Sequence, residues 1–282
     1  LVDELVVNEL AIDTAVVKAD YVDRQLKAHV LADNLEWKMQ QMQLYASAEA
    51  MLAWDDTFAP ERLTGMLCFS HLRYELPTYS LLVQVGDTLV LPFVEGGFSL
   101  RDVPLYTMGK QPLVVNGRVE VLDRPSLQLQ VDAHGGNLLQ RRPTRQALLY
   151  GDARVSGRVV INGPFDALSL SGSLVLRSGS SIHYIYRDAM LTAGNQLDDV
   201  VTFVNFAQAA SPSSLARKTY GSYGFAMNLN VAIDPTVQLE VMLGASGQNT
   251  CTLQGGGNLN VQYIPAGGLR LSGKYTVESG EV

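Results

Sequence analysis

Cysteine and histidine are scarce in this chain of 282 residues, which contains two cysteines and four histidines. Cys68 and Cys251 lie too far apart in the sequence to form a zinc site or a CxxC redox motif. We therefore expect two separate reduced thiols, with a disulfide left open. The histidines are His29, His71, His134 and His183, and none of them has a second histidine or a cysteine two or four positions away. The sequence predicts no metal and no cofactor.

Charge is also sparse, since 17% of the residues are charged and the formal net charge is −7. No Lys/Arg cluster in the sequence could neutralise a row of phosphates, which argues against a nucleic-acid partner. The same balance disfavours electrostatic docking on anionic lipid headgroups. No apolar run reaches the roughly 18–20 residues that a membrane-spanning helix needs. The chain begins at Leu1 without Met or a signal segment, so we expect a piece of a longer protein.

Glycine is missing from the first 64 residues and becomes frequent after Tyr150. Within the glycine-free part, residues 26–54 are rich in Ala, Leu, Met, Gln, Glu and Lys, which favours a helix by propensity. Their apolar residues nevertheless alternate, as strand residues do. From the residues alone, helix and strand both stay open for this segment.

Strict alternation of apolar and polar residues is the strongest pattern in the chain, and it is clearest from Phe225 to Val277. A period of two places the apolar residues on one face of a sheet and the polar residues on the other. Turns such as Asp234–Pro235 are expected to join consecutive strands as hairpins. Gly255–Gly257 fits a β-turn or bulge better than a phosphate cradle, because no helix and no Lys-Ser/Thr follow it. The pattern predicts an all-β protein built as a long antiparallel meander.

Catalytic motifs are absent from the sequence. The acidic doublets Asp55–Asp56 and Asp198–Asp199 stand next to turns and read as solvated loops rather than a general acid/base pair. Ser180–Ser181 lies in an expected turn and is not part of a GxSxG elbow. Nothing in the sequence supports an enzyme.

The apolar face of the predicted sheet allows two interpretations. It could be the closed core of a β-sandwich, or it could line a sheet that curls into a trough open to a lipid chain. A closed lipid-binding barrel, or a membrane barrel with reversed polarity, would give a similar pattern. Small residues on the apolar parity weakly favour a cavity, since they leave room against the sheet; they are Ala153, Gly157, Gly172 and Gly273.

Several strings of residues carry more information than the composition does. Two of them contain glycine and leucine in hairpin-like order, at residues 150–163 (YGDARVSGRVVING) and 168–174 (LSLSGSL). They are followed by Ile182–Tyr184, by Val200–Phe206, and by the strings LNVAIDP, QGGGNLNV and GLRLSGKYTVESG. In order and spacing this series resembles the TamB family, whose members are periplasmic subunits of the translocation and assembly module of diderm bacteria. The resemblance is specific from about residue 92 to 282.

This resemblance implies a β-taco, a sheet folded into a U with an apolar concave face. It favours strands for residues 26–54 and implies two continuous parts: less regular groove repeats over 1–149 and the TamB-like region over 150–282. It further implies a periplasmic location, an Omp85-type outer-membrane barrel as partner, and an inner-membrane anchor outside this chain. The implied role is phospholipid movement between the two membranes, or outer-membrane protein assembly.

The function expected is therefore a non-enzymatic, lipid-conducting groove that contacts phospholipid acyl chains. The alternative is a chaperone-like scaffold that pairs its sheet edge with outer-membrane protein strands. Candidate groove residues are those of the apolar parity: Val155, Val159, Ile161, Leu168, Leu170, Leu174, Leu176, Met227, Leu229, Val231, Ile233, Leu239, Val241, Val261 and Leu271.

Overall fold

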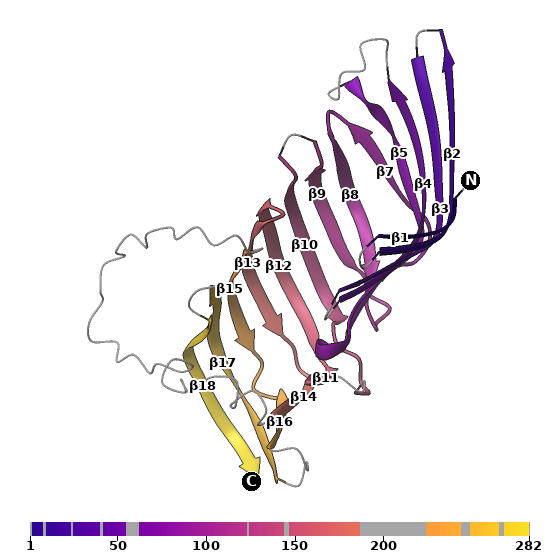
Figure 1. The fold of residues 1–282 in the computed structure, drawn as a ribbon. Coiled ribbons are helices and arrows are strands. Elements are labelled where there is room, and N and C mark those ends of the chain that lie inside the picture. The colour runs from indigo at the N-terminus through magenta and orange to yellow at the C-terminus, as the bar shows by residue number, and fades with distance from the viewer. Residues whose placement is uncertain are drawn as a thin grey trace.

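In a computed structural model the described residues of the protein form one sheet of 18 strands, drawn in Figure 1. The structure describes residues 2–7, 10–23, 25–39, 42–54, 62–122, 124–143, 147–186, 224–243, 249–264 and 268–281. The all-β, groove-shaped fold class predicted from the sequence is confirmed. Among the described residues no helix is long and apolar enough to cross a membrane.

Most strands are longer than five residues, and consecutive strands mostly pair antiparallel. Their bounds are β1 (Val2–Val7), β2 (Leu10–Val22), β3 (Gln25–Met39), β4 (Met42–Trp54), β5 (Thr64–Leu76), β6 (Leu81–Val85), β7 (Leu89–Val94), β8 (Gly97–Tyr106), β9 (Leu113–Glu120), β10 (Ser126–Asn137), β11 (Leu149–Asp152), β12 (Arg154–Pro164), β13 (Ala167–Leu176), β14 (Ser181–Tyr186), β15 (Gly224–Ile233), β16 (Gln238–Leu243), β17 (Asn249–Ile264) and β18 (Gly268–Glu281). A short 3-10 turn, η2 (Pro77–Tyr79), precedes β6.

The ambiguous segment 26–54 forms strands β3 and β4, which pair antiparallel along most of their length. Its helix propensity is overridden because cross-strand pairing buries one face of both strands. The apolar parity changes between Ala32 and Leu35, and the register of the pair shifts at the same place. Asn34 there adopts a left-handed backbone with φ of 49°. The change in alternation therefore marks a bend in the strand.

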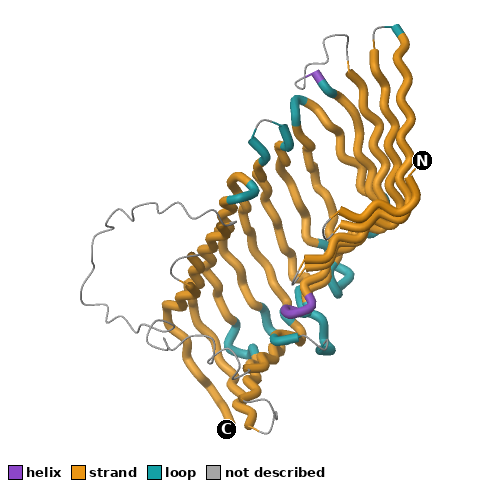
Figure 2. The backbone as a smooth tube through the Cα atoms, in the orientation of Figure 1, coloured by secondary structure: helices purple, strands orange, loops and turns teal. Residues whose placement is uncertain are grey.

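Such bends divide the sheet into two arms. The first arm contains β7, β9, β10, β12, β13 and β15, and the second arm contains β6, β11, β14 and β16. Strands β3, β4, β5 and β17 run through both arms, with bulges near Asn34, Tyr45 and Gly255. The bulge at Gly255 confirms the prediction for the triple glycine. Figure 2 shows the strands folding back along one side, which gives the sheet a U-shaped profile.

The hairpin expected at Asp234–Pro235 is instead a corner of the U. Strands β15 and β16, on either side of Asp234–Pro235, do not pair with each other; β15 pairs parallel with β13, and β16 pairs parallel with β14. The turn at Ser178–Gly179 likewise carries the chain from the first arm to the second. The sequence predicted a purely antiparallel meander, so the parallel pairs β13/β15 and β14/β16 depart from that prediction. The reason is that each of these turns changes arm rather than reversing the chain within one arm.

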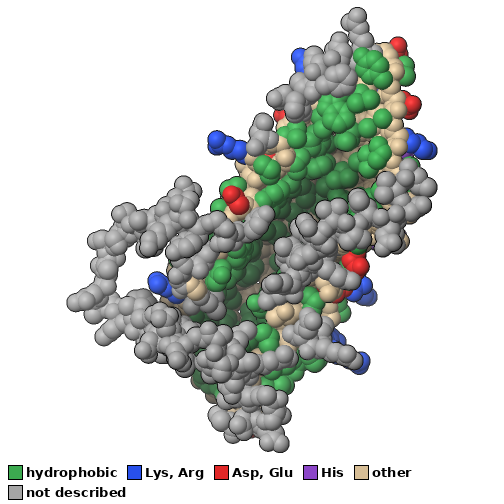
Figure 3. All heavy atoms as spheres, viewed as in Figure 1, with side chains coloured by type: hydrophobic (Ala, Val, Ile, Leu, Met, Phe, Trp, Pro, Cys, Tyr) green, Lys and Arg blue, Asp and Glu red, His purple; other side chains and the backbone are tan. Residues whose placement is uncertain are grey.

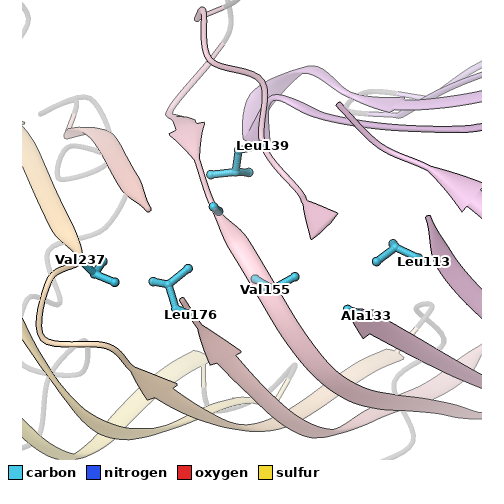
Figure 4. Close-up of a cluster of buried hydrophobic side chains, with 7 residues drawn as sticks. Leu113, Ala133, Leu139, Val155, Leu176 and Val237 are labelled. Carbon is cyan, nitrogen blue, oxygen red and sulfur yellow. The ribbon is translucent and has the colours of Figure 1, made fainter. Parts of the chain in front are cut away.

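A cluster of buried hydrophobic residues lies at the corner between the arms. Val155 and Leu176, from the corner ends of β12 and β13, pack with Val237 from the turn that leads to β16. Leu113, Ala133 and Leu139 complete one side of the cluster, and Figure 4 shows these side chains gathered on one face of the ribbon. The corner is thus held by ordinary hydrophobic packing. Cys68 and Cys251 are free and lie on different strands, β5 and β17.

Candidate functional site

The inner face of the first arm carries unbroken rows of apolar residues. Residues directly opposite each other in neighbouring strands point to the same face, so the register defines each row. One row runs across eight strands from β8 to β18 through Val103, Val115, Val131, Val159, Gly172, Leu229, Val261 and Leu271. The next row contains Leu105, Leu113, Ala133, Gly157, Leu174, Val231, Leu259 and Gly273. With strands spaced about 4.8 Å apart, each row is about 34 Å long.

Part of each row is buried and part is open. On β8, β9 and β10 the rows contain four buried residues, Val103, Leu113, Val115 and Ala133. From β12 to β18 the described residues leave the inner face open: Val159, Leu170, Leu229 and Val231 remain partly exposed, whereas the corner residue Val155 is only 6% exposed. A sandwich core would bury all of them to a similar extent. Figure 3 shows hydrophobic side chains gathered along a hollow that follows the length of the sheet. The inner face is therefore an open groove from β12 to β18, with a packed corner.

The outer face of the same strands is polar and satisfies its own hydrogen bonds. Arg158 donates from Nε to Asp132 Oδ1 at 2.6 Å, and Gln130 donates to the other oxygen at 2.7 Å. The bond from Arg158 is the main cause that lowers the pKa of Asp132 below its ordinary value. Further along, Asn260 Nδ2 donates to Asn228 and Asn230 at 2.8 and 2.9 Å. The two faces thus differ sharply in polarity.

The small residues of the inner rows have a structural reason other than leaving room. Gly157 has a φ of 142°, and a Cβ there would lie 2.1 Å from the carbonyl oxygen of Ser173. Gly172 has a φ of 158°, and its Cβ would meet the Arg158 carbonyl oxygen at 2.2 Å. A side chain would therefore collide with the neighbouring strand. Ala153 is 5% exposed and fills the corner core, so it does not widen a cavity.

All fifteen candidate residues lie on the inner face. Val159, Leu229, Val261 and Leu271 share one row, Leu174 and Val231 the next, and Ile161, Leu170 and Met227 a third. Leu168 follows the same parity towards the rim. Val155, Leu176 and Ile233 belong to the packed corner. Leu239 and Val241 lie on β16 of the second arm, with the parity of buried Val237.

Other inner-face residues were not among the candidates. Val103, Val115 and Val131 extend the first row onto β8, β9 and β10, upstream of the region from which the candidates were drawn. Their alternation is visible in the sequence, for example in Leu113 and Val115. It would have identified them if the same parity rule had been applied before residue 150.

On the outer face of the second arm a serine, a histidine and a glutamate lie next to one another, as in a catalytic triad, but without an oxyanion hole. Ser181 Oγ lies 3.4 Å from His183 Nε2, and Glu240 Oε2 lies 3.1 Å from Nδ1 without hydrogen-bond geometry. The ring of Tyr150 stacks on the imidazole of His183 with a centroid distance of 4.8 Å. Burial, and secondly the charge of Glu240, raise the pKa of the Tyr150 hydroxyl. Ser181 sits in a strand paired on both sides, so the amides around it serve the ladders and not an oxyanion hole. These residues tie β11, β14 and β16 together.

The described ranges contain no group of three His, Cys, Asp or Glu residues placed to hold a metal ion.

The architecture defines a class: a single-sheet β-groove protein with an apolar inner face and a polar outer face. The TamB C-terminal domain family matches residues 105–282. The chain belongs to the TamB family, as its residues had indicated.

No curated protein and no solved structure matches the chain. The family assignment carries a general TamB-type role and points to the periplasm of the cell envelope. The family is not known for enzymes. The match begins at Leu105, upstream of the division expected at 149/150, and the sheet is continuous through that point.

Proposed function

We propose that this protein conducts phospholipid acyl chains along its groove and thereby supports lipid transport between inner and outer membranes. The observation that carries the proposal is the part of the two apolar rows that stays partly exposed on the inner face, from Val131 to Leu271 in the first row and from Gly157 to Gly273 in the second. At a strand spacing of about 4.8 Å these parts are about 24 Å and about 19 Å long, which exceeds the roughly 15 Å that one leaflet contributes to a bilayer core. A chain lying in the groove can therefore stay in apolar surroundings while it moves.

The energetic basis is the transfer of hydrocarbon out of water. Each buried CH₂ contributes about 0.8 kcal/mol, and the contact is non-directional, so successive positions along a row are nearly equivalent. An equal affinity at each position allows movement without breaking specific bonds. The polar outer face offers no comparable path, because Asp132, Arg158 and the asparagines occupy the equivalent positions there.

Native mass spectrometry of the protein purified from a diderm bacterium, followed by organic extraction, tests the proposal. We expect co-purified phospholipid, and we expect the lipid-free protein to take up a fluorescent fatty acid. Protein that is free of lipid as isolated, and that binds no fatty acid after delipidation, would contradict the groove function. An Omp85-type outer-membrane barrel remains the partner that we propose on family grounds.

A second function, binding of client strands at the sheet edge, is favoured by β18. Among the described strands β18 pairs only with β17, and Val277 on it is 51% exposed. An open edge presents unpaired N–H and C=O groups that can add another strand. Val277→Lys places a charge on this edge and should weaken capture of outer-membrane protein segments while leaving fatty-acid uptake intact. Unchanged capture would count against edge pairing.

A further inference from the structure

A cavity of about 680 Å³ on the outer side of the corner is unusually basic for a chain with a net charge of −7. Its lining comes from the β8–β9 turn, the end of β10, the segment after it, the end of β11 and the start of β12. We call it the basic pocket and define it by Lys110, Arg141, Arg142 and Arg154, with Arg177 beside it. The size is that of a site for a small ligand.

The pocket brings these cations together from distant parts of the sequence. A Cβ at Gly135, which lines the pocket, would lie 3.5 Å from Arg177 Nη1 and 4.0 Å from Ser156 Oγ. Ser156 Oγ is buried and has no hydrogen-bond partner among the described residues. A side chain at this position would therefore crowd the space between the guanidinium group and the hydroxyl.

One carboxylate faces these five cations within the pocket lining. Asp152 Oδ1 accepts from Arg141 Nε at 2.9 Å and from Asn137 Nδ2 at 2.7 Å. In the part of the chain that the structure describes, the side chains of Lys110, Arg142, Arg154 and Arg177 have no acceptor. Asp152 thus neutralises one cation, and no other carboxylate stands in the pocket lining to balance the remaining positive charge.

The pocket is separate from the groove. Arg154 and Arg177 point to the face opposite Val155 and Leu176, which lie in the corner core. A lipid whose chains lie in the groove cannot reach the pocket with its headgroup, because the sheet stands between them. A ligand in this pocket would therefore be independent of the proposed transport function.

We propose that the basic pocket binds a phosphate group, either free in solution or carried by a lipid headgroup at a membrane surface. A phosphomonoester carries close to two negative charges near pH 7 and three acceptor oxygens, so it can bridge several guanidinium groups. A carboxylate has one charge and matches one arginine fork, and Asp152 already illustrates that limit. The planar guanidinium groups of the pocket can also contact two phosphate oxygens at once, which the compact ammonium group of a lysine does not do.

The test measures binding of inorganic phosphate by calorimetry at low salt, and co-flotation with phosphatidylcholine vesicles with and without phosphatidic acid. We expect the Arg154→Gln/Arg177→Gln double variant to weaken binding at least tenfold, since each charge-assisted hydrogen bond contributes about that factor or more. Arg270→Gln/Lys274→Gln removes the same charge from exposed positions on β18 and should leave binding unchanged. Asp152→Asn should strengthen it, because the only competing carboxylate of the pocket lining becomes neutral.

The two ligand sources give different results. Calorimetric binding of inorganic phosphate that depends on the arginines supports the pocket with a soluble ligand, and arginine-dependent flotation only with phosphatidic acid supports it with a lipid ligand. Equal effects of the pocket and β18 variants, or no binding of either probe, would overturn the proposal, as would a preference for polyglutamate over phosphate. Fatty-acid uptake should survive in the pocket variant, so failure of one proposal does not affect the other.

Discussion

Leu229→Asp distinguishes an open groove from a closed core. Leu229 lies in the middle of the first apolar row, between Gly172 on β13 and Val261 on β17, and its side chain is partly exposed. Because water already reaches this position, the carboxylate stays hydrated and the fold should lose no more than about 2 kcal/mol, less than a fully buried Leu contributes. In a closed core an unpaired charge would unfold the protein.

The effect on lipid binding should be larger than the effect on the fold. An acyl chain crossing one strand spacing exposes about four CH₂ groups to the hydrated carboxylate, and at about 0.8 kcal/mol each the loss is about 3 kcal/mol. This corresponds to fatty-acid binding weaker by about two orders of magnitude, since 1.4 kcal/mol is about tenfold. The measurement is fluorescent fatty-acid titration, with circular dichroism and urea denaturation as the check on the fold.

Asn230→Asp is the matched control for this experiment. It places the same charge on the neighbouring residue of the same strand, on the outer face, and keeps the oxygen that accepts from Asn260. We expect nearly normal fatty-acid binding in this variant. The reasoning fails if Leu229→Asp unfolds while Asn230→Asp does not, since that result means a closed core. It also fails if both variants bind fatty acid equally well.

Three further predictions concern the stability of the sheet. Leu176 lies in the corner core and is 9% exposed, so Leu176→Ala should lower the free energy of unfolding by about 2–4 kcal/mol. Leu271 is 62% exposed, and Leu271→Ala should change the free energy of unfolding little. Equal urea midpoints for the two variants would contradict the assignment of the core. Gly157→Ala should lower the free energy of unfolding by more than about 1 kcal/mol, because the added Cβ would meet the Ser173 carbonyl oxygen. Gly268 also has a positive φ, but a Cβ added there would have no atom within 4 Å, so Gly268→Ala should lower it less. Asp132 has a lowered pKa in the folded state, so its contribution to stability is present above about pH 4 and is lost as the pH falls further. Asp132→Asn should therefore be less stable than the native protein at pH 7 but show a smaller loss of melting temperature on acidification; parallel pH profiles would refute this role of the ion pair.

The sequence by itself determined the class of the sheet and the composition of its faces. Strict alternation fixes which residues share a face, because successive strand residues point in opposite directions. For this reason all fifteen candidates lie on the inner face, including Leu239 and Val241 on the second arm. The change of parity between Ala32 and Leu35 even marked the position of a bend, although propensity alone suggested a helix there.

Tertiary structure decided whether the apolar face is covered and where distant residues meet. Alternation is the same for a sandwich and for a groove, so only the pairing of whole strands and the partial exposure of residues such as Val231 distinguish them. A turn such as Asp234–Pro235 can reverse a chain or carry it to another arm, and its neighbours decide which. The basic pocket was invisible for the same reason: Lys110, Arg154 and Arg177 are far apart in the sequence, and the fold of the sheet brings them together.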